Sequence, residues 1–292
     1  MSHFTVMVIG PNPEDQLAPF DESITLEIPI IVGELTEEEK NKVIDYYKRN
    51  ENIDLPFDEL YELKGHDWNN NCYEKHDGVW NQVSYYNPKS KWDWYKLGGR
   101  WQGFLKLKEG TEGTIGEKSW GMEHHNKPNH CDATIKGNID IEGMRNDAAI
   151  KAGELYDKVM EFIKDLPPTT KWSDFIKRIE TGEITWDIAS ALYQEQPRVN
   201  ALRNKEAIAK LGYFVDVDDF NVTKEEYVQD AKNSALSTFA ILKDGKWYEK
   251  GKMGWWAIVT DEVEQNEWDE QVTKMIDELP DDTLISIYDC HI

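Results

Sequence analysis

The chain has 292 residues, a formal net charge of -23, 56 acidic against 33 basic residues, and 39% hydrophobic residues. This composition is typical of a soluble globular protein of one large or two smaller domains, and no apolar run is long enough to span a membrane. The acidity argues against a polymeric nucleic acid as partner, because long phosphate chains need a broad basic surface. The first ten residues lack a basic leader, and the three cysteines cannot all pair with one another, so we expect the cytoplasm.

Two strands and a helix are predicted near the N-terminus. The apolar run of residues 3–9 predicts a short buried strand. Isoleucine or leucine alternates with other residues from 24 to 30, which predicts a half-buried strand, and Pro29 places it at a sheet edge because proline cannot donate to a ladder. Thr36 and Glu39 have the spacing of a capping box, which predicts a helix that ends near residue 49.

The next segment, residues 52–87, has no regular pattern and is predicted to be a long, ordered surface loop, a class of segment that often carries function. It contains His66 and His76, and either imidazole could serve as a general acid or base because it titrates near neutrality. We prefer His66, since Gly65 precedes it and Trp68 follows it.

Residues 84–108 reverse the sign of the charge, with six basic residues against one acid. Three tryptophans and three tyrosines are interleaved with these cations, an arrangement that suits an anionic planar ligand. Gly98 and Gly99 allow a left-handed turn where a side chain would crowd whatever lies there. The alternation from 100 to 108 then predicts a strand with Arg100 and Trp101 on opposite faces.

This segment provides the candidate ligand site. The guanidinium of Arg100 would bind a phosphate bidentately, an indole would stack on a base, and Asp93 would orient a water or a ribose hydroxyl. The opposite interpretation is that Trp94 and Trp101 are core residues and that Arg100 pairs with an internal acid. The ligand-binding candidates are Lys91, Trp92, Trp94, Arg100 and Trp101, and the catalytic candidates, should the ligand be hydrolysed, are His66 and Asp93.

The middle of the chain is predicted to be helical. Apolar residues recur at helical spacing from 148 to 163, and Pro167 and Pro168 end that helix. Thr223 and Glu226 form a second capping box. Shorter helices are predicted over residues 172–179, 186–193 and 199–211, with a strand over 212–217. We therefore predict a helical insertion over residues 146–235.

Strands resume after the insertion. They are predicted over residues 238–243, 246–250, 255–260 and 283–288, with Asp244-Gly245 as a hairpin turn. A helix that Asn266 caps separates the last two strands, which predicts a right-handed crossover and parallel pairing between them. The predicted fold class is α+β, a mixed sheet formed by residues 1–145 and 236–292 and interrupted by the helical insertion.

The other motifs of the sequence are weaker evidence for a functional site. A metal site could be imagined from Cys72 and His76, or from His124, His125, His130 and Cys131, but neither set has the paired spacing of zinc ligands, and no metal site is predicted. Asp216-x-Asp218-Asp219 resembles an acidic metal motif and also an ordinary polar stop after a strand. His291 follows Cys290 on a strand, so the two point to opposite faces, and His291 could reach a site at the strand edge. No cofactor is specified.

Five segments carry a resemblance: MSHFTVMVIG, NPKSKWDWYKLGGRWQGFLKL, KGNIDIEGMR, GKMGWW and LPDDTLISIYDCHI. They resemble a large family of uncharacterised proteins encoded by bacteriophages and prophages. The resemblance covers most of the chain and weakens in the helical middle. It implies a phage accessory protein in the host cytoplasm, and such proteins often counter host defence or rework nucleotides.

Three functions follow as hypotheses. The first is a protein that binds, and in one version hydrolyses, a small anionic, nucleotide-like ligand at residues 89–101. The second is an acidic inhibitor that docks on a host defence protein through its final helix, because residues 261–282 contain ten acids and one base. The third is a homo-oligomeric scaffold whose tryptophans pack between subunits.

Overall fold

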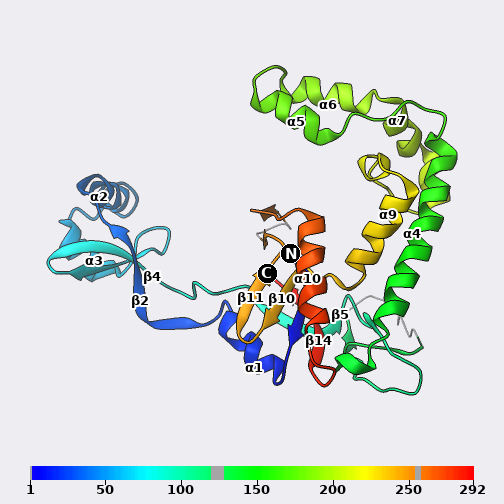
Figure 1. Cartoon of the computed structure of the whole chain (residues 1–292). Coiled ribbons are helices and arrows are strands. Elements are labelled where there is room, and N and C mark those ends of the chain that lie inside the picture. Colours follow the sequence, from blue (N-terminus) through cyan, green and yellow to red (C-terminus); the bar gives the residue numbers. More distant parts are fainter. Residues whose placement is uncertain (1, 120–127, 254–257) are drawn as a thin grey trace. The chain divides into compact units, whose positions relative to one another are not determined.

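The computed structural model describes residues 2–119, 128–253 and 258–292 (Figure 1). The chain divides into two compact units. Unit 1 consists of Met1–Pro13 and Lys96–Cys290, and unit 2 consists of Glu14–Tyr95 and His291–Ile292. The predicted helical insertion, residues 146–235, lies wholly within unit 1.

Within the described residues, the main sheet has seven strands in the order β11-β10-β1-β14-β5-β7, with β9 paired to β14. Strand β1 pairs with β10 in parallel, and β10 pairs with β11 in antiparallel fashion. The α+β class and a mixed sheet shared by the two ends of the chain are therefore confirmed. The strands are β1 (His3–Ile9), β5 (Trp94–Gly99), β7 (Glu117–Lys118), β9 (Ala133–Ile135), β10 (Ala240–Lys243), β11 (Lys246–Glu249) and β14 (Leu284–His291).

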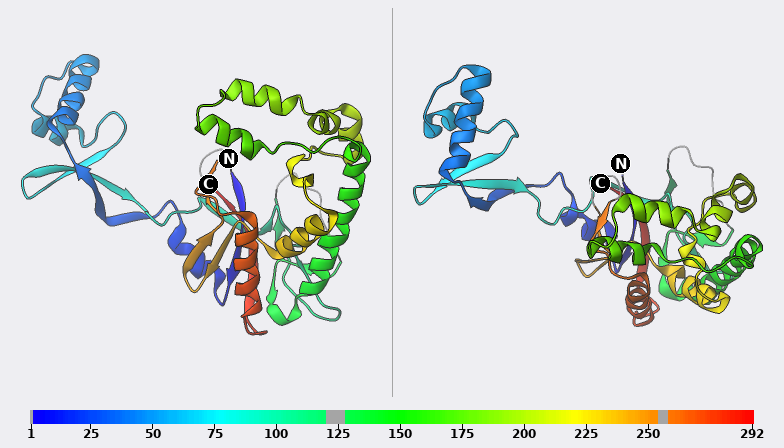
Figure 2. Two further views of the ribbon diagram at one scale, coloured as in Figure 1. Left: turned by 45° about the horizontal axis from the view of Figure 1, so that its top comes forward. Right: turned by 90° about the horizontal axis from the view of Figure 1, so that it is seen from above.

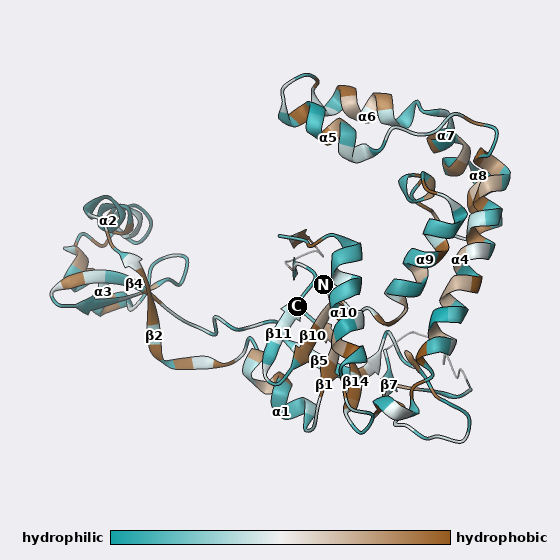
Figure 3. Cartoon of the chain, in the orientation of Figure 1, coloured by the Kyte–Doolittle hydropathy of each residue, from teal (hydrophilic) through white to brown (hydrophobic). Residues whose placement is uncertain are grey.

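The core of unit 1 lies between this sheet and helix α10 (Gln265–Asp277) (Figure 1). Strands β1 and β14 are buried along almost their whole length and are coloured as strongly apolar in Figure 3. From the helix, Trp268, Val272 and Ile276 pack against them, as the spacing predicted. The cap was predicted wrongly: the N-cap residue is Glu264, not Asn266.

The predicted crossover to β14 is also wrong. In the described part of the chain, β13 (Val259–Thr260) pairs only with β12 (Lys252–Met253), in an antiparallel ribbon. Apolar composition alone does not say which sheet a strand joins, and this explains the error. Residues 255–257 of the predicted strand lie outside the described residues.

The helical section of unit 1 has a core of its own. Its long helix α4 lies beside α9 (Figures 1 and 2), and the capping box at Thr223 is confirmed. The predicted helix over 199–211 is two helices, because the side chain of Asn204 accepts the Ala207 N–H at 2.8 Å and starts α8. The predicted strand over 212–217 is absent from these described residues. The helices are α4 (Ile141–Ile163), α5 (Trp172–Glu180), α6 (Trp186–Gln194), α7 (Pro197–Arg203), α8 (Lys205–Leu211) and α9 (Lys224–Asn233).

Unit 2 contains an antiparallel sheet, β2-β4-β3, and two helices that pack on it through a small aromatic core. The edge position of the first strand and the capping box of the first helix are confirmed. The strand is more exposed than predicted, since Ile28 is 82% exposed. The elements are β2 (Thr25–Glu34), α2 (Glu37–Glu51), α3 (Phe57–Lys64), β3 (Cys72–His76) and β4 (Val79–Tyr86), preceded by α1 (Pro13–Leu17).

The long loop predicted over residues 52–87 is wrong, because this segment contains α3 and the β3–β4 hairpin. Polar side chains cover most of β3, which hides its alternation: only Tyr73 is buried in that strand. The turn between the strands is Asp77-Gly78, with φ of 51° and 85°. That pair is a standard two-residue hairpin signal. Among the helices of the described residues, none is both long and apolar enough to cross a membrane.

Candidate functional site

The strand predicted over residues 100–108 is wrong, and a tight turn takes its place. Strand β5 ends at Gly99, and within this range only Leu105–Lys106 forms a strand, β6, which pairs with β8 (His130–Cys131). Gly98, Gly99 and Gly103 have φ of 77°, 54° and 73°, a region that glycine occupies without steric cost. The three glycines therefore make a turn of residues 98–103, and we call it the glycine turn.

Asp289, a fully buried residue of β14, fixes the start of this turn. Its Oδ2 atom accepts the backbone N–H of Arg100 at 2.9 Å and the hydroxyl of Ser119 at 3.0 Å. Its Oδ1 atom lies 2.8 Å from Nδ1 of His3. A buried carboxylate with these partners is satisfied on both oxygens.

Asp132, also fully buried, fixes the end of the turn. Its Oδ1 atom accepts the N–H groups of Gly103 at 2.6 Å and Phe104 at 3.4 Å, and its Oδ2 atom accepts that of Gly116 at 2.7 Å. Burial raises the pKa of Asp132, and these N–H donors oppose the rise only in part. These backbone N–H groups of the turn thus donate to the protein's own carboxylates, and those of Trp101 and Gln102 donate to carbonyls within the turn. The turn is therefore not a backbone cradle for phosphate.

The glycines are required because the two aspartates approach so closely. A Cβ atom at Gly98 would lie 2.6 Å from Oδ2 of Asp132, and one at Gly99 would lie 2.3 Å from Cβ of Asp289. The expectation that a side chain here would crowd its surroundings is confirmed. The sequence analysis did not anticipate that the crowding partners are buried acids.

Arg100 itself extends from the anchored backbone into solvent. Its side chain is exposed, and in the described part of the chain it forms no ion pair. Strand β7 pairs with β5 in parallel so that Lys118 lies opposite Gly99, next to Arg100 in the chain. Lys118 is likewise exposed and likewise makes no ion pair with a described residue. Lys118 is therefore paired with the residue that precedes Arg100, in the strand that Figure 3 labels β7.

Two other cations of the basic segment form ion pairs within unit 1. Lys96 pairs with Glu117 at 3.4 Å, and Lys106 pairs with Asp147 at 2.7 Å. Lys108 donates to a backbone carbonyl, that of Gly137, at 2.7 Å. Fewer cations of this segment are therefore available to a ligand than the sequence suggested.

The predicted site residues are divided between the units. Arg100 and Trp101 belong to unit 1, where Trp101 is half-buried and packs against the core. Unit 2 contains the other five, Lys91, Trp92, Trp94, His66 and Asp93.

In unit 2, Trp92 is only 5% exposed and its indole N–H donates to the carbonyl of Leu17 at 3.3 Å. Asp93 and Trp94 meet His291, the residue expected at a strand edge: Asp93 Oδ1 lies 2.6 Å from Nδ1 of His291, and the Trp94 ring stacks on the imidazole with centroids 5.3 Å apart. Trp94 is 39% exposed. Lys91 is half-buried, and its backbone N–H donates to Phe20.

His66 lies in the connection from α3 to β3 and is exposed. Its Nδ1 atom lies 2.8 Å from the carbonyl oxygen of Asp67, and its own carbonyl accepts the hydroxyl of Tyr47 at 2.9 Å. No hydrogen bond or ion pair between described side chains joins His66 to Asp93. The two catalytic candidates thus have separate sets of contacts.

Four residues that contact or pair with the glycine turn, directly or through Asp289, were not predicted: His3, Lys118, Asp132 and Asp289. One signal was available. Asp289 follows an apolar run, and an acid inside a buried strand needs a partner. The other three have no signal in their neighbouring residues, because each reaches the turn through contacts between residues far apart in the sequence.

Fold and site together define an α+β protein with a carboxylate-anchored turn that presents an exposed arginine. No protein-family model, curated protein or solved structure is similar to the chain. The phage origin that the resemblance implies stays a prediction. No cluster of His, Cys, Asp and Glu that could hold a metal ion occurs among the described residues, and His124 and His125 lie outside them.

Proposed function

We propose that unit 1 binds a small anionic, nucleotide-like ligand at Arg100 and Lys118. The observation that carries the proposal is an exposed guanidinium without a carboxylate partner among the described residues, on a backbone that Asp289 fixes through the Arg100 N–H. A fixed backbone lowers the entropy lost on binding. A guanidinium matches the geometry of phosphate and carboxylate oxygens bidentately.

The surrounding charge gives this pair its selectivity. The chain has a net charge of -23, so anions are repelled from most of its surface and meet a cationic edge at β7. A long nucleic acid would extend from that edge over acidic surface, whereas a mononucleotide would not. We therefore propose a monomeric ligand and not a polymer.

Binding is the activity proposed for this site. Hydrolysis would also require a general base, and the two catalytic candidates of the sequence analysis, His66 and Asp93, belong to unit 2. Sequestration of a nucleotide in the host cytoplasm would suit the phage origin that the resemblance implies.

Arg100→Ala tests the proposal. We expect it to weaken binding of the best ligand about tenfold or more, because a hydrogen bond to a charged group is worth about 1.5–3 kcal/mol. Thermal-shift screening of mononucleotides, dinucleotides and cyclic nucleotides would find the ligand, and calorimetry would measure its affinity. Arg49→Ala is the control, since Arg49 is exposed. Its contacts are a 3.7 Å ion pair with Asp45 and a hydrogen bond from Nε to the Asp45 carbonyl at 3.2 Å. Equal affinities in wild type and Arg100→Ala would refute the site.

A second function, inhibition of a host defence protein, is favoured by the outer face of α10. Glu267 and Glu270 are exposed there, and neither makes an ion pair with a described residue. A free acidic face attracts a basic partner at low salt. The wild type should capture one stoichiometric host protein below about 0.1 M salt, where the Debye length is on the order of 10 Å. We expect the double variant Glu267→Lys, Glu270→Lys to abolish this capture. Capture that survives the double reversal would exclude α10 as the contact.

A further inference from the structure

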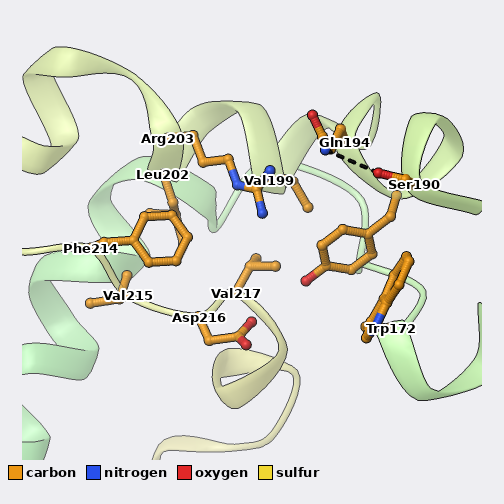
Figure 4. A pocket seen from close by; sticks show the side chains of 11 residues that line it. Trp172, Ser190, Gln194, Val199, Leu202, Arg203, Phe214, Val215, Asp216 and Val217 are labelled. Atoms are coloured by element: carbon orange, nitrogen blue, oxygen red, sulfur yellow. Dashed lines mark hydrogen bonds between the residues drawn. The ribbon is translucent and has the colours of Figure 1, made fainter. Parts of the chain in front are cut away.

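A cavity of about 270 Å³ lies in the helical section of unit 1 (Figure 4). It is formed where helices α5, α6 and α7 meet the segment that follows α8. Aromatic, charged and aliphatic side chains line it together, among them Trp172, Tyr193, Arg203, Phe214, Asp216 and Val217.

The floor and walls of the cavity are apolar. Val199, Leu202 and Val217 line it and are almost fully buried. Phe214 is 56% exposed and forms part of its rim. A concave apolar surface with a few polar groups is the usual character of a small-molecule site.

Two opposite charges line the same cavity without pairing with each other. The guanidinium of Arg203 lies 5.6 Å from the ring centroid of Phe214 and 6.0 Å from that of Tyr193, and it makes no ion pair with any described residue. The exposed carboxylate of Asp216 accepts a backbone N–H, that of Asp218, at 3.0 Å. Figure 4 shows Arg203 and Asp216 among the side chains that line this cavity.

Tyr193 lines the cavity with a neutral phenol. Its ring packs edge-to-face on Trp172 with centroids 5.3 Å apart. Burial raises the pKa of Tyr193, and the negative charges of Asp218 and Asp216 raise it further. The phenol therefore keeps its proton at neutral pH.

From this arrangement we propose that the cavity binds a free aromatic α-amino acid. The carboxylate of such a ligand would meet Arg203, its ammonium would meet Asp216, and its ring would fill the apolar part beside Trp172 and Phe214. A ligand with only one charge would form an ion pair with only one of these two side chains. The volume lies below the range of about 300–1,000 Å³ usual for drug-sized ligands, so the cavity suits an amino acid better than a nucleotide.

Calorimetry on the full chain tests this with three related probes: L-phenylalanine, phenethylamine, which lacks the carboxylate, and phenylacetate, which lacks the ammonium. We expect phenylalanine to bind at least tenfold more tightly than either analogue. Arg203→Gln should remove the advantage of phenylalanine over phenethylamine, and Asp216→Asn should remove its advantage over phenylacetate. Because each variant affects a different analogue, a general loss of structure would not reproduce the pattern.

Arg178→Gln is the matched control. Arg178 also lies over an aromatic ring, 5.8 Å from the centroid of Phe175, but outside the cavity. The Arg178→Gln variant should bind all three probes with wild-type affinities. No binding of phenylalanine, phenylacetate binding as tight as phenylalanine, or wild-type discrimination in Arg203→Gln would overturn the proposal. Asp216 is exposed, so we expect Asp216→Asn to fold. If Arg203→Gln unfolds, the affinities of Asp216→Asn for phenylalanine and phenylacetate test the proposal.

Discussion

Gly99→Ala is expected to destabilise unit 1 strongly. The new Cβ atom would lie 2.3 Å from Cβ of buried Asp289, and φ is 54°. A left-handed conformation costs a non-glycine residue about 1–2 kcal/mol, and overpacking a rigid core costs about 1–3 kcal/mol more. We therefore expect a loss of about 3 kcal/mol or more in the free energy of unfolding, measured by chemical denaturation.

Gly110→Ala separates the two contributions. Gly110 also has a positive φ, 75°, but nothing lies within 4 Å of a Cβ atom added there. Only the backbone cost of about 1–2 kcal/mol should remain. Equal destabilisation by the two substitutions would mean that Asp289 does not press against the glycine turn.

The second large effect is expected in unit 2, at Asp67. This buried carboxylate accepts the backbone N–H groups of Asn69 at 2.8 Å and Asn71 at 2.9 Å, the Asn71 amide at 2.8 Å, and the Tyr73 hydroxyl at 2.7 Å. Asp67→Ala would leave these donors unmatched, at about 1–3 kcal/mol for each one that stays buried. We expect about 3–5 kcal/mol in total, seen as faster hydrogen exchange across α3 and the β3–β4 hairpin.

Asp45→Ala provides the comparison. Asp45 is exposed and makes one loose ion pair, with Arg49 at 3.7 Å, so its removal should change stability by less than about 0.5 kcal/mol. Similar exchange in both variants would show that Asp67 does not organise the hairpin.

The same network predicts how unit 2 responds to acid. Burial opposes ionisation of Asp67, yet hydrogen bonds from Tyr73 and Asn71 together hold the pKa of Asp67 below the ordinary 3.8. Because the folded-state pKa is lowered, the stability it contributes is present above pH 3.8 and is lost as the pH falls through the folded-state value. Asp67→Asn should abolish this part of the acid response. An unchanged pH profile in that variant would contradict the prediction.

Local signals predicted the elements that depend on local chemistry. Capping boxes located α2 and α9, and apolar runs located β1 and β14, because caps and buried faces are written in neighbouring residues. The β3–β4 hairpin was missed because its strands are mostly polar, although Asp77-Gly78 marked the turn.

At the candidate site, the sequence predicted the left-handed turn at Gly98 and Gly99, and the positive φ of both residues confirms it. Arg100 lies within this turn and is exposed, and its role as a ligand-binding residue stays a prediction. Its anchor, Asp289, and the second cation, Lys118, could not be predicted. Asp289 is 189 residues away along the chain, and Lys118 is brought close by the pairing of β7 with β5. The sequence pattern made Trp92 a ligand-binding candidate because it lies among cations. In the structure Trp92 is packed in the interior, and its indole N–H donates to the carbonyl of Leu17.

The most direct test of the account follows the guanidinium of Arg100 itself. In protein labelled with ¹⁵N-arginine, the Nε–Hε signal of Arg100 is identified by its disappearance in Arg100→Lys. On titration with the nucleotide found by screening, that signal should shift in a saturable way while the signal of Arg49 stays in place. A nucleotide that binds and leaves the Arg100 signal unmoved would contradict the central claim that this side chain receives the anion.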